Sequence, residues 1–347
     1  MNSRHLLSLL TFSVFAGCVA ESVPDGEVGY DPREADGAYG PIGVSAVPDV
    51  RCAAAPNAGA KRSWRHLTSR AVALGSVKHR GFDLVASSAA TTQVLAGEIS
   101  YGVNDKALED EAVDVFACRA GSWQKLGSAL TSNEGAFSLT LRGASLLPIG
   151  MRDLFVSVQG DRTGTRFLAL VTAPGTPVAV SDIDGTLTSS ENAFATSLVT
   201  GASVALHPGA PGTFNALVVR GYQPVYLTAR GDVFTTDTRS WLAAKGLPRG
   251  PVRLAPSAIT LPGDATVEFK SGVLAALRGA GLEVAVGIGN RASDIAAYVS
   301  AGLAGDRVFI KLPEYTSEVS ADLNAGRATG FSSYDALTSV VSSLPVR

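Results

Sequence analysis

The residues best suited to chemistry stand at the end of an apolar run. The run Val178-Ala-Val-Ser stops at two carboxylates, Asp182 and Asp184, and Gly185 and Thr186 follow them. A short apolar run with alternating β-branched residues predicts a buried parallel strand. In an open α/β sheet, ligands bind in the crevice at the C-terminal ends of such strands. A strand that simply ends in an Asp-Gly turn would show the same letters.

Three later segments carry further polar side chains at predicted strand ends or helix starts. Leu227-Thr-Ala-Arg230 closes the next strand, Phe269-Lys270 begins a helix, and Gly289-Asn-Arg-Ala-Ser-Asp294 closes another strand. Together with the first pair of acids they supply three carboxylates, a hydroxyl and an ammonium group. This set of groups suits phosphoryl transfer through a covalent aspartyl-phosphate.

Asp182 is the predicted nucleophile of that reaction. A carboxylate attacks phosphorus without a base, because it is already ionised at neutral pH. Its repulsion from the phosphate must be cancelled, and a divalent cation that bridges Asp182, Asp294 and a phosphate oxygen would do this. Oxygen ligands favour Mg²⁺. The predicted ligands of this Mg²⁺ are Asp182, Asp184 and Asp294.

The other polar residues are expected to contact the phosphoryl group or move protons. Lys270 would supply a second positive charge beside the equatorial oxygens. The Thr228 hydroxyl and backbone N–H groups near Gly185 would hold phosphoryl oxygens. Asp184 would protonate the leaving oxygen and then take a proton from the attacking water. The residues expected to contact the substrate are Gly185, Thr186, Arg230 and Asn290.

Each of these residues also has an ordinary structural explanation. Thr228 could end a strand, Lys270 could be a surface lysine, and Asn290 could be a turn residue. Asp294 could be an acid at a helix N-terminus, where the helix dipole favours negative charge. Taken singly these explanations are favoured. The order of all the segments along one α/β region favours the chemical interpretation.

The four segments resemble the four motifs of the haloacid dehalogenase phosphatase superfamily. More narrowly, Ser181-Asp-Ile-Asp-Gly-Thr-Leu-Thr188, Tyr226-Leu-Thr-Ala-Arg230 and Gly289-Asn-Arg-Ala-Ser-Asp-Ile-Ala-Ala-Tyr298 are similar to the lipin and App1-type Mg²⁺-dependent phosphatidate phosphatases. The resemblance covers about Val178 to Ile310. A weaker resemblance to the domain that precedes the catalytic part of App1-type proteins lies in His79-Arg-Gly-Phe-Asp83 and Tyr101-Gly102.

The resemblance implies a function as well as a fold. It implies Asp182 as nucleophile, Asp184 as acid and base, Asp294 as metal ligand, and conversion of phosphatidate to diacylglycerol. Asn290 departs from the wider superfamily, in which many members carry an acid, but agrees with the lipin-type pattern. Two alternatives remain: a phosphatase of another soluble or protein-bound phosphomonoester, and a phosphatidate-binding module without turnover. Retention of both Asp182 and Asp184 favours the enzyme.

The elements that must position these residues alternate between strands and helices. The expected strands are Val178–Ser181, Val225–Thr228, Val252–Ala255, Val284–Gly289 and Val308–Ile310. The expected helices are Thr213–Arg220, Val233–Lys245, Glu268–Arg278 and Ser293–Ala301. This alternation predicts a haloacid-dehalogenase-like, Rossmannoid parallel sheet with helices on both faces. Only about 40 residues separate Asp184 from Thr228, which leaves room for no more than a minimal cap and suits a large or membrane-embedded substrate.

A small all-β sandwich domain is expected before the phosphatase domain. Short strands with Gly, Asn and Asp between them and no helical period predict this architecture. The expected strands are Gly81–Val85, Gln93–Tyr101, Ala112–Arg119, Ala136–Leu141, Leu154–Gly160 and Thr165–Thr172. The predicted divisions are 1–17 for a signal peptide, 18–77 for a tether, 78–175 for the sandwich and 176–347 for the phosphatase domain.

The N-terminus has the layout of a secretory signal of lipoprotein type. A short polar start precedes the apolar run from Leu6 to Ala16, and Phe15-Ala-Gly-Cys18 resembles a bacterial lipobox with Phe in place of the usual Leu. Lipidation at Cys18 would anchor an exported protein to a bacterial membrane. The alternative is a soluble export signal. The segment from Lys61 to Leu74 predicts a short basic helix. Packing of this helix on the next domain is favoured over its contact with anionic lipid headgroups.

Composition bounds the remaining possibilities. The chain of 347 residues is 46% hydrophobic and has a formal charge of −2, from 29 basic and 31 acidic residues. This balance offers no general field for nucleic acid. Cys52 and Cys118 are the cysteines besides Cys18, so a disulfide or two separate thiols are both consistent with export. Three cysteines and four scattered histidines show no zinc-site spacing.

Overall fold

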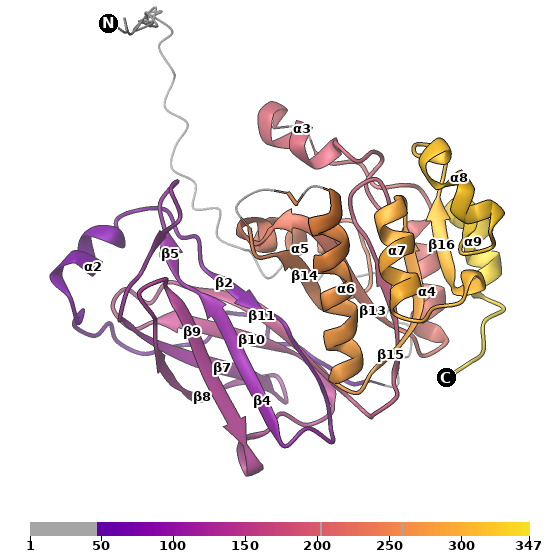
Figure 1. Cartoon of the computed structure of the whole chain (residues 1–347). Coiled ribbons are helices and arrows are strands. Elements are labelled where there is room, and N and C mark those ends of the chain that lie inside the picture. Colours follow the sequence, from indigo (N-terminus) through magenta and orange to yellow (C-terminus); the bar gives the residue numbers. More distant parts are fainter. Residues whose placement is uncertain (1–46, 202, 258–259, 262) are drawn as a thin grey trace, which may run out of the picture. The chain divides into compact units, whose positions relative to one another are not determined.

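The computed structural model describes residues 47–201, 203–257, 260–261 and 263–347 (Figure 1). The predicted signal peptide, the predicted lipidation site Cys18 and the first part of the predicted tether lie outside these residues. Within the described part, none of the helices has a stretch that is long and apolar enough to cross a bilayer.

Two β-sheets form the region before residue 176. The larger sheet has the order β3-β11-β10-β7-β8, with β1 added beside β10, and the smaller has the order β2-β4-β9. A two-stranded ribbon, β5-β6, completes the set. The strands are β1 (Asp49–Val50), β2 (Arg80–Phe82), β3 (Leu84–Ser87), β4 (Thr92–Glu98), β5 (Ser100–Tyr101), β6 (Lys106–Ala107), β7 (Ala112–Arg119), β8 (Ser122–Leu130), β9 (Ala136–Arg142), β10 (Gly150–Val158) and β11 (Gly164–Thr172).

An apolar core lies between the two sheets. Leu95 on β4 and Phe137 on β9 belong to the same buried cluster as Val115 on β7 and Phe167 on β11. Four of the six predicted strands are present in outline. The predicted strand Gly81–Val85 is divided between β2 and β3, which lie in different sheets, and Gln93–Tyr101 is divided between β4 and β5. The sequence prediction missed β8, whose mixed polar pattern reflects its place as the edge strand of the larger sheet.

Residues 47–77 pack on the sheets, which differs from the prediction of a tether up to residue 77. β1 pairs with β10, and a disulfide joins Cys52 to Cys118 with a Cα–Cα distance of 5.8 Å. The disulfide decides between the two alternatives that the sequence left open. The predicted basic helix is short: α2 covers only Leu67–Val72, and Ser69 is its one buried residue.

A six-stranded, all-parallel sheet forms the second half of the chain. Its order is β14-β13-β12-β15-β16-β17. Its strands are β12 (Pro177–Ser181), β13 (Gln223–Gly231), β14 (Val252–Ala255), β15 (Glu283–Gly289), β16 (Val308–Lys311) and β17 (Thr329–Phe331). The helices are α3 (Ala193–Thr200), α4 (Ala210–Val219), α5 (Thr235–Ala244), α6 (Gly263–Gly279), α7 (Ala292–Ser300), α8 (Thr316–Asn324) and α9 (Tyr334–Val341). The sequence did not predict β17, α3, α8 or α9.

Helices cover both faces of this sheet. α4, α5 and α9 contribute Phe214, Leu242 and Leu337 to one apolar cluster. α6 and α7 contribute Leu274 and Ile295 to a cluster on the other face, where Figure 1 shows both helices in front of the strands. The fold is therefore a mixed α/β architecture with a parallel sheet, as the alternating pattern predicts.

The sheet order reverses beside β12. The chain runs outward from β12 through β13 to β14, and then returns to the other side of β12 with β15. A crevice at the carboxyl ends of the strands is expected at such a reversal. Asp182 follows β12 directly, and Asn290 follows β15, so both lie where the strand order reverses.

Candidate active site

A pocket of about 770 Å³ brings the predicted polar residues together. Its lining comes from segments that are far apart in the sequence: the loop after β12, the end of β13, α6, and the loop between β15 and α7. The predicted site residues in its lining are Asp182, Asp184, Thr228, Arg230, Lys270 and Asn290.

Lys270 joins two buried carboxylates at the base of the site. Its Nζ lies 2.6 Å from Oδ1 of Asp182 and 2.6 Å from Oδ1 of Asp294. All three side chains are almost fully buried. Lys270 projects from α6, whose apolar face is fixed by Leu274 and Leu277 in the core. The helix thus fixes the ammonium group between the ends of β12 and β15.

The buried trio has a strong electrostatic coupling. Burial raises the pKa of Asp182 well above its ordinary value, and Lys270 opposes this shift. Burial alone would lower the pKa of Lys270, but Asp182 and Asp294 together raise it above its usual range. The sequence argument treated Asp182 as an ordinary ionised carboxylate. In the structure its ionised form depends on the neighbouring ammonium group.

The second oxygens of the two acids are also engaged. Oδ2 of Asp294 accepts hydrogen bonds from the backbone N–H groups of Asn290 (3.0 Å) and Arg291 (3.1 Å) at the start of α7. Asp294 therefore combines the helix-capping role considered from the sequence with the contact to Lys270. Thr186 Oγ1 lies 3.0 Å from Asp182 Oδ2 and 3.2 Å from Asn290 Oδ1, so its single proton reaches one of them at a time.

Asp184 has different partners from Asp182. Thr228 Oγ1 donates to its Oδ2 at 2.9 Å, and Arg230 donates to both of its oxygens at 2.7 to 3.1 Å. The remaining guanidinium nitrogen, Nη1, donates to Thr238 at 3.1 Å. Thr228 and Arg230, which were expected to hold the substrate, instead hold this carboxylate. Their placement on one strand, β13, directs both side chains toward the loop after β12.

The loop that carries the two acids is fixed from within. Gly185 adopts a φ of 70°, a left-handed conformation that favours glycine. Its N–H donates to Thr188 Oγ1 at 2.8 Å, so this donor, expected to contact phosphoryl oxygens, serves the loop itself. Tyr334 donates its hydroxyl proton to the Thr186 carbonyl at 2.8 Å. Asp182 and Asp184 therefore stand on a rigid turn.

The sequence analysis missed several residues of the pocket, among them Glu191 and Phe194. Glu191 accepts a hydrogen bond from Asn290 Nδ2 at 2.9 Å, and burial raises the pKa of its carboxyl group. Phe194 on α3 lies under the guanidinium group of Arg230, 3.7 Å from ring centre to Cζ. No motif marks the segment between Thr188 and α4. The only signal in this segment that could have indicated a pocket residue is the aromatic side chain of Phe194, which follows the paired acids.

The charge of the pocket favours a bound cation. The described lining includes five acidic and three basic side chains. Each basic one already pairs with an acid: Lys270 with Asp182, Arg230 with Asp184, and Arg291 with Glu318. A phosphate dianion would therefore meet a net negative surface unless a cation accompanied it.

The donor groups suit Mg²⁺ in part. Asp182 and Asp294 offer buried carboxylate oxygens, the ligand type that Mg²⁺ prefers. The carboxylate of Asp184 is held by Arg230 and Thr228, which differs from its predicted place as a third ligand. In the described residues, no group of three His, Cys, Asp or Glu side chains is already arranged around a metal position. Oxygen ligands and negative charge fit a divalent cation held by Asp182 and Asp294.

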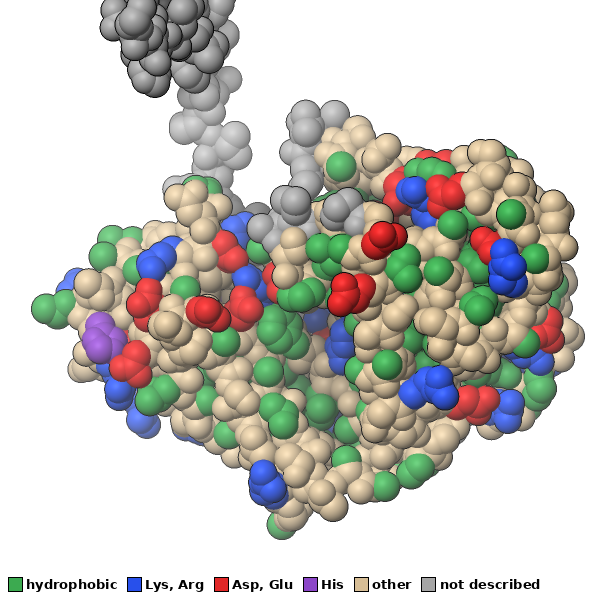
Figure 2. All heavy atoms as spheres, in the orientation of Figure 1, with side chains coloured by type: hydrophobic (Ala, Val, Ile, Leu, Met, Phe, Trp, Pro, Cys, Tyr) green, Lys and Arg blue, Asp and Glu red, His purple; other side chains and the backbone are tan. Residues whose placement is uncertain are grey.

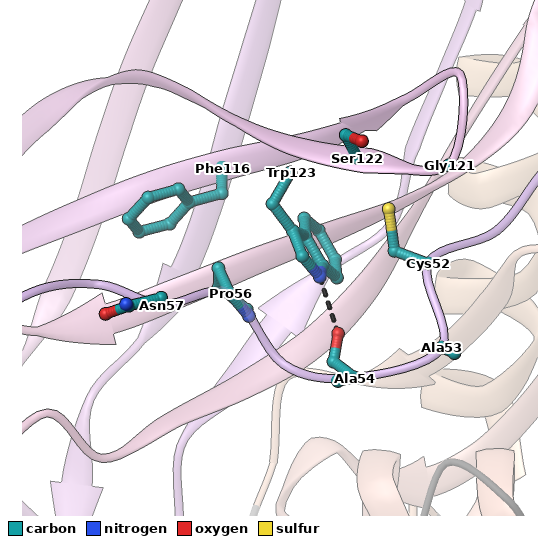
Figure 3. Close-up of a pocket in the computed structure, with 9 residues that line it drawn as sticks. All are labelled: Cys52, Ala53, Ala54, Pro56, Asn57, Phe116, Gly121, Ser122 and Trp123. Atoms are coloured by element: carbon teal, nitrogen blue, oxygen red, sulfur yellow. Dashed lines mark hydrogen bonds between the residues drawn. The ribbon is translucent and has the colours of Figure 1, made fainter.

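A second pocket, of about 430 Å³, lies beside the disulfide in the β-rich region (Figure 3). Trp123 and Phe116 line it, and Trp123 Nε1 donates to the Ala54 carbonyl at 2.6 Å. Its lining holds no titratable side chain apart from the bonded Cys52, so it offers no groups for acid or base chemistry.

Both halves of the chain match domains of one group of proteins. Residues 77–171 match the family model of the PITM 1-3 beta-sandwich domain, and residues 179–311 match that of the PITM 1-3 LNS2 domain. The pair of matches agrees with the two sheets described above. The second match places Asp182, Lys270 and Asp294 inside a single recognised domain.

Curated relatives show the same similarity. The human membrane-associated phosphatidylinositol transfer protein 1 is 27% identical over 67% of this chain, and the Drosophila melanogaster protein retinal degeneration B is 26% identical over 68%. These alignments cover 18% of the length of each relative. A solved Thermotoga maritima structure assigned as a beta-phosphoglucomutase is 14% identical, covers 48% of this chain and 98% of its own, and has a TM-score of 0.35. That degree of structural likeness supports no conclusion about activity.

Proposed function

We propose that this chain is a Mg²⁺-dependent phosphoric monoester hydrolase that acts on a membrane lipid phosphate, with phosphatidate as the substrate and diacylglycerol as the product. One observation carries the proposal: the same pocket contains two acids, and each acid has its own partners. Asp182 contacts Lys270, whereas Asp184 contacts Thr228 and Arg230. Pairs of carboxylates in different environments are typical of sites that divide nucleophilic and acid–base roles.

In the proposed reaction Asp182 attacks the phosphorus atom of the ester. A bond forms between a carboxylate oxygen and phosphorus as the bond to the lipid oxygen breaks, and Asp184 gives that oxygen a proton. Asp184 then takes a proton from a water molecule that attacks the aspartyl-phosphate. Inorganic phosphate leaves, and Asp182 is regenerated as a carboxylate.

Lys270 supports the first step through its charge. Its ammonium group favours the ionised form of Asp182, which burial disfavours, and it would lie beside the transferred phosphoryl group. Asp182 and Asp294 would hold the Mg²⁺. When bound, the ion would offset the negative charge of the phosphate.

The lipid part of the proposal rests on the relatives and on the shape of the site. The names of the matched proteins describe phosphatidylinositol transfer and membrane association. The segment between the paired acids and α4 contains one short helix, α3, with no separate cap domain in the described residues. An open pocket of this kind accommodates a phosphate group that remains attached to a membrane lipid.

Two alternatives make different predictions. A phosphatase of another phosphomonoester would need the same residues but would not prefer a lipid. A phosphatidate-binding module would need positive charge for the phosphate but neither a nucleophile nor an acid. Because the three basic side chains of the described lining are each paired with an acid, the pocket is poorly suited to binding phosphate alone.

Phosphate release from matched substrates tests the proposal. Purified protein with Mg²⁺ would be given detergent-dispersed phosphatidate, lysophosphatidate and a soluble phosphomonoester. We expect turnover of the lipids, none after chelation by EDTA, and none for Asp182→Asn. Asp264→Asn is the matched control, since it makes the same change in the same pocket outside the proposed machinery. Phosphatidate binding without phosphate release by the wild type would support the binding module instead.

A further inference from the structure

We propose that a surface on α2 and the neighbouring turn docks this protein onto an anionic lipid bilayer. The surface, called the α2 patch below, consists of the side chains of Leu67, Leu74 and Val103. Their exposed fractions are 94%, 86% and 92%. No other large hydrophobic side chain in the described part of the chain is more than 72% exposed.

Two turns that touch each other bring the patch together. The N–H of Gly102 donates to the Ser76 carbonyl at 2.7 Å, and a Cβ atom at Gly75 would lie 2.7 Å from the Gly102 nitrogen. Leu74 and Val103 stand directly beside this close contact. Leu67 is the first residue of α2, and Leu74 lies two residues past the end of the helix, where its N–H donates to the Ala71 carbonyl at 3.3 Å.

The position of the patch is fixed without burial of its leucines. The Glu111 carboxylate accepts hydrogen bonds from the backbone N–H groups of Arg65 (3.0 Å) and His66 (3.0 Å), immediately before α2. Trp64 packs against the core of the β-rich region. Since these contacts hold the segment, the three apolar side chains project from a rigid support. An amphipathic helix that packed on its own domain would bury such residues.

The charges around the patch favour phospholipid headgroups. Residues 61–78 contain five Lys and Arg residues and no Asp or Glu. Arg65 pairs with Asp110. The exposed side chains that make no ion pair with another described residue are Lys61, Arg62, Arg70 and Lys78. Figure 2 shows hydrophobic, basic and His side chains at the left edge of the view, where Figure 1 places α2, with acidic side chains beside them.

Exposed aliphatic side chains with basic side chains around them suit the boundary between the headgroups and the acyl chains of a bilayer. A protein partner with an apolar groove would leave the four cations without a role. Each basic side chain near an anionic surface strengthens binding by about fivefold. This inference goes beyond the proposed reaction, because a docked protein that released no phosphate would still satisfy it.

Hydrogen exchange of the full chain tests the location of docking. The probes are vesicles of phosphatidylcholine alone and of phosphatidylcholine mixed with phosphatidylserine. We expect the mixed vesicles to slow exchange in residues 66–78 and 100–106, and phosphatidylcholine alone to have little effect. This measurement identifies the contacting segment even if other parts of the chain also bind lipid. Unchanged exchange in both segments would overturn the proposal, as would protection that grows with protein concentration in the absence of vesicles.

Sedimentation with the mixed vesicles tests the side chains. The combined variant Leu67→Ser, Leu74→Ser and Val103→Ser should weaken partitioning by about 1,000-fold, since each of the three losses removes roughly a factor of ten. The matched control replaces three other exposed apolar residues, Leu130→Ser, Val219→Ser and Val346→Ser, and should partition as the wild type does. Arg70→Gln with Lys78→Gln should weaken binding and reduce its dependence on salt. Equal partitioning of the patch variant and the control variant would refute the assignment.

Discussion

Arg230 binds both carboxylate oxygens of Asp184, with Nε 2.9 Å from Oδ2 and Nη2 2.7 Å from Oδ1. The ring of Phe194 covers one face of the guanidinium group, and Thr238 accepts from its remaining nitrogen. A planar fork held in this way fixes the direction of the carboxylate as well as its charge. The proposed acid and base is thus oriented before any substrate arrives.

Substitution of Arg230 by lysine tests this orienting role. Lysine keeps the positive charge but loses the two parallel hydrogen bonds, so Asp184 should turn away from the leaving oxygen. We expect Arg230→Lys to lower kcat by about 100-fold or more while KM changes little. Steady-state phosphate release measures both constants. Arg291→Lys is the control, since it makes the same change in the same pocket at an ion pair with Glu318 outside the proposed machinery. A lysine variant at position 230 with normal kcat would contradict the assigned role.

Removal of the Lys270 ammonium should destabilise the fold. Lys270→Met leaves Asp182 and Asp294 buried with no cation between them, which costs about 3–5 kcal/mol. The loss should be largest at alkaline pH and smaller in acid, because protonation relieves the two carboxylates. Urea unfolding at pH 5 and pH 8 would measure it.

Two comparisons strengthen that measurement. Lys106→Met breaks an exposed pair with Glu109 and should cost less than about 1 kcal/mol. Asp182→Asn combined with Lys270→Met removes a charge of each sign and should recover part of the stability. If Lys270→Met were as stable as the wild type at pH 8, the coupling between the three side chains would be much weaker than the geometry indicates.

The sequence predicted which residues meet but not how they pair. Asp182, Lys270 and Asp294 come together because parallel strands end at one edge of the sheet, as the apolar pattern predicts, and α6 passes that edge. The start of this helix was predicted just before Lys270, but α6 starts at Gly263, so Lys270 lies about two turns inside it. Nothing in the spacing tells which carboxylate Arg230 contacts. That choice depends on the direction of side chains at the end of β13.

The sequence analysis did not predict segments whose apolar residues lack a strand or helix period. Glu191 and Phe194 reach the pocket through a segment that has no strand or helix period before α3. β8 was missed because this edge strand is largely exposed and has no apolar run, whereas β7 is buried along almost its whole length. Residues 47–77 lack periodicity as well, and a disulfide and β1 hold them to the sheets.

Asp83 should couple the β-rich region to the parallel sheet. Its buried carboxylate accepts from Leu168 N on β11 (2.6 Å), from Val252 N on β14 (2.8 Å) and from Arg239 on α5 (2.9 Å). Asp83→Asn removes the charge that Arg239 requires and should cost about 3 kcal/mol or more. Calorimetry should then resolve two transitions where the wild type shows one. Asp306→Asn is the control, because Asp306 makes an exposed pair with Arg307 within the parallel-sheet region and its loss should cost less than about 1 kcal/mol. A single unshifted transition for Asp83→Asn would exclude this coupling.

His79 should make the protein sensitive to acid. Burial lowers the pKa of this histidine from 6.5 to about 4, and the ring lies edge-on to Tyr101 with its Nε2 2.9 Å from Thr163 Oγ1. Between these two pKa values the unfolded chain binds more protons than the folded one, so stability falls as the pH is lowered from about 6.5 to about 4. The full contribution is about 3 kcal/mol. The non-titrating variant His79→Gln should be less stable at pH 7 because packing is lost, yet its decline toward pH 4 should be shallower by this amount. Urea unfolding at several pH values measures the two slopes, and the exposed His66→Gln supplies the matched control. Parallel declines of the wild type and His79→Gln would show that the buried imidazole does not govern the acid response.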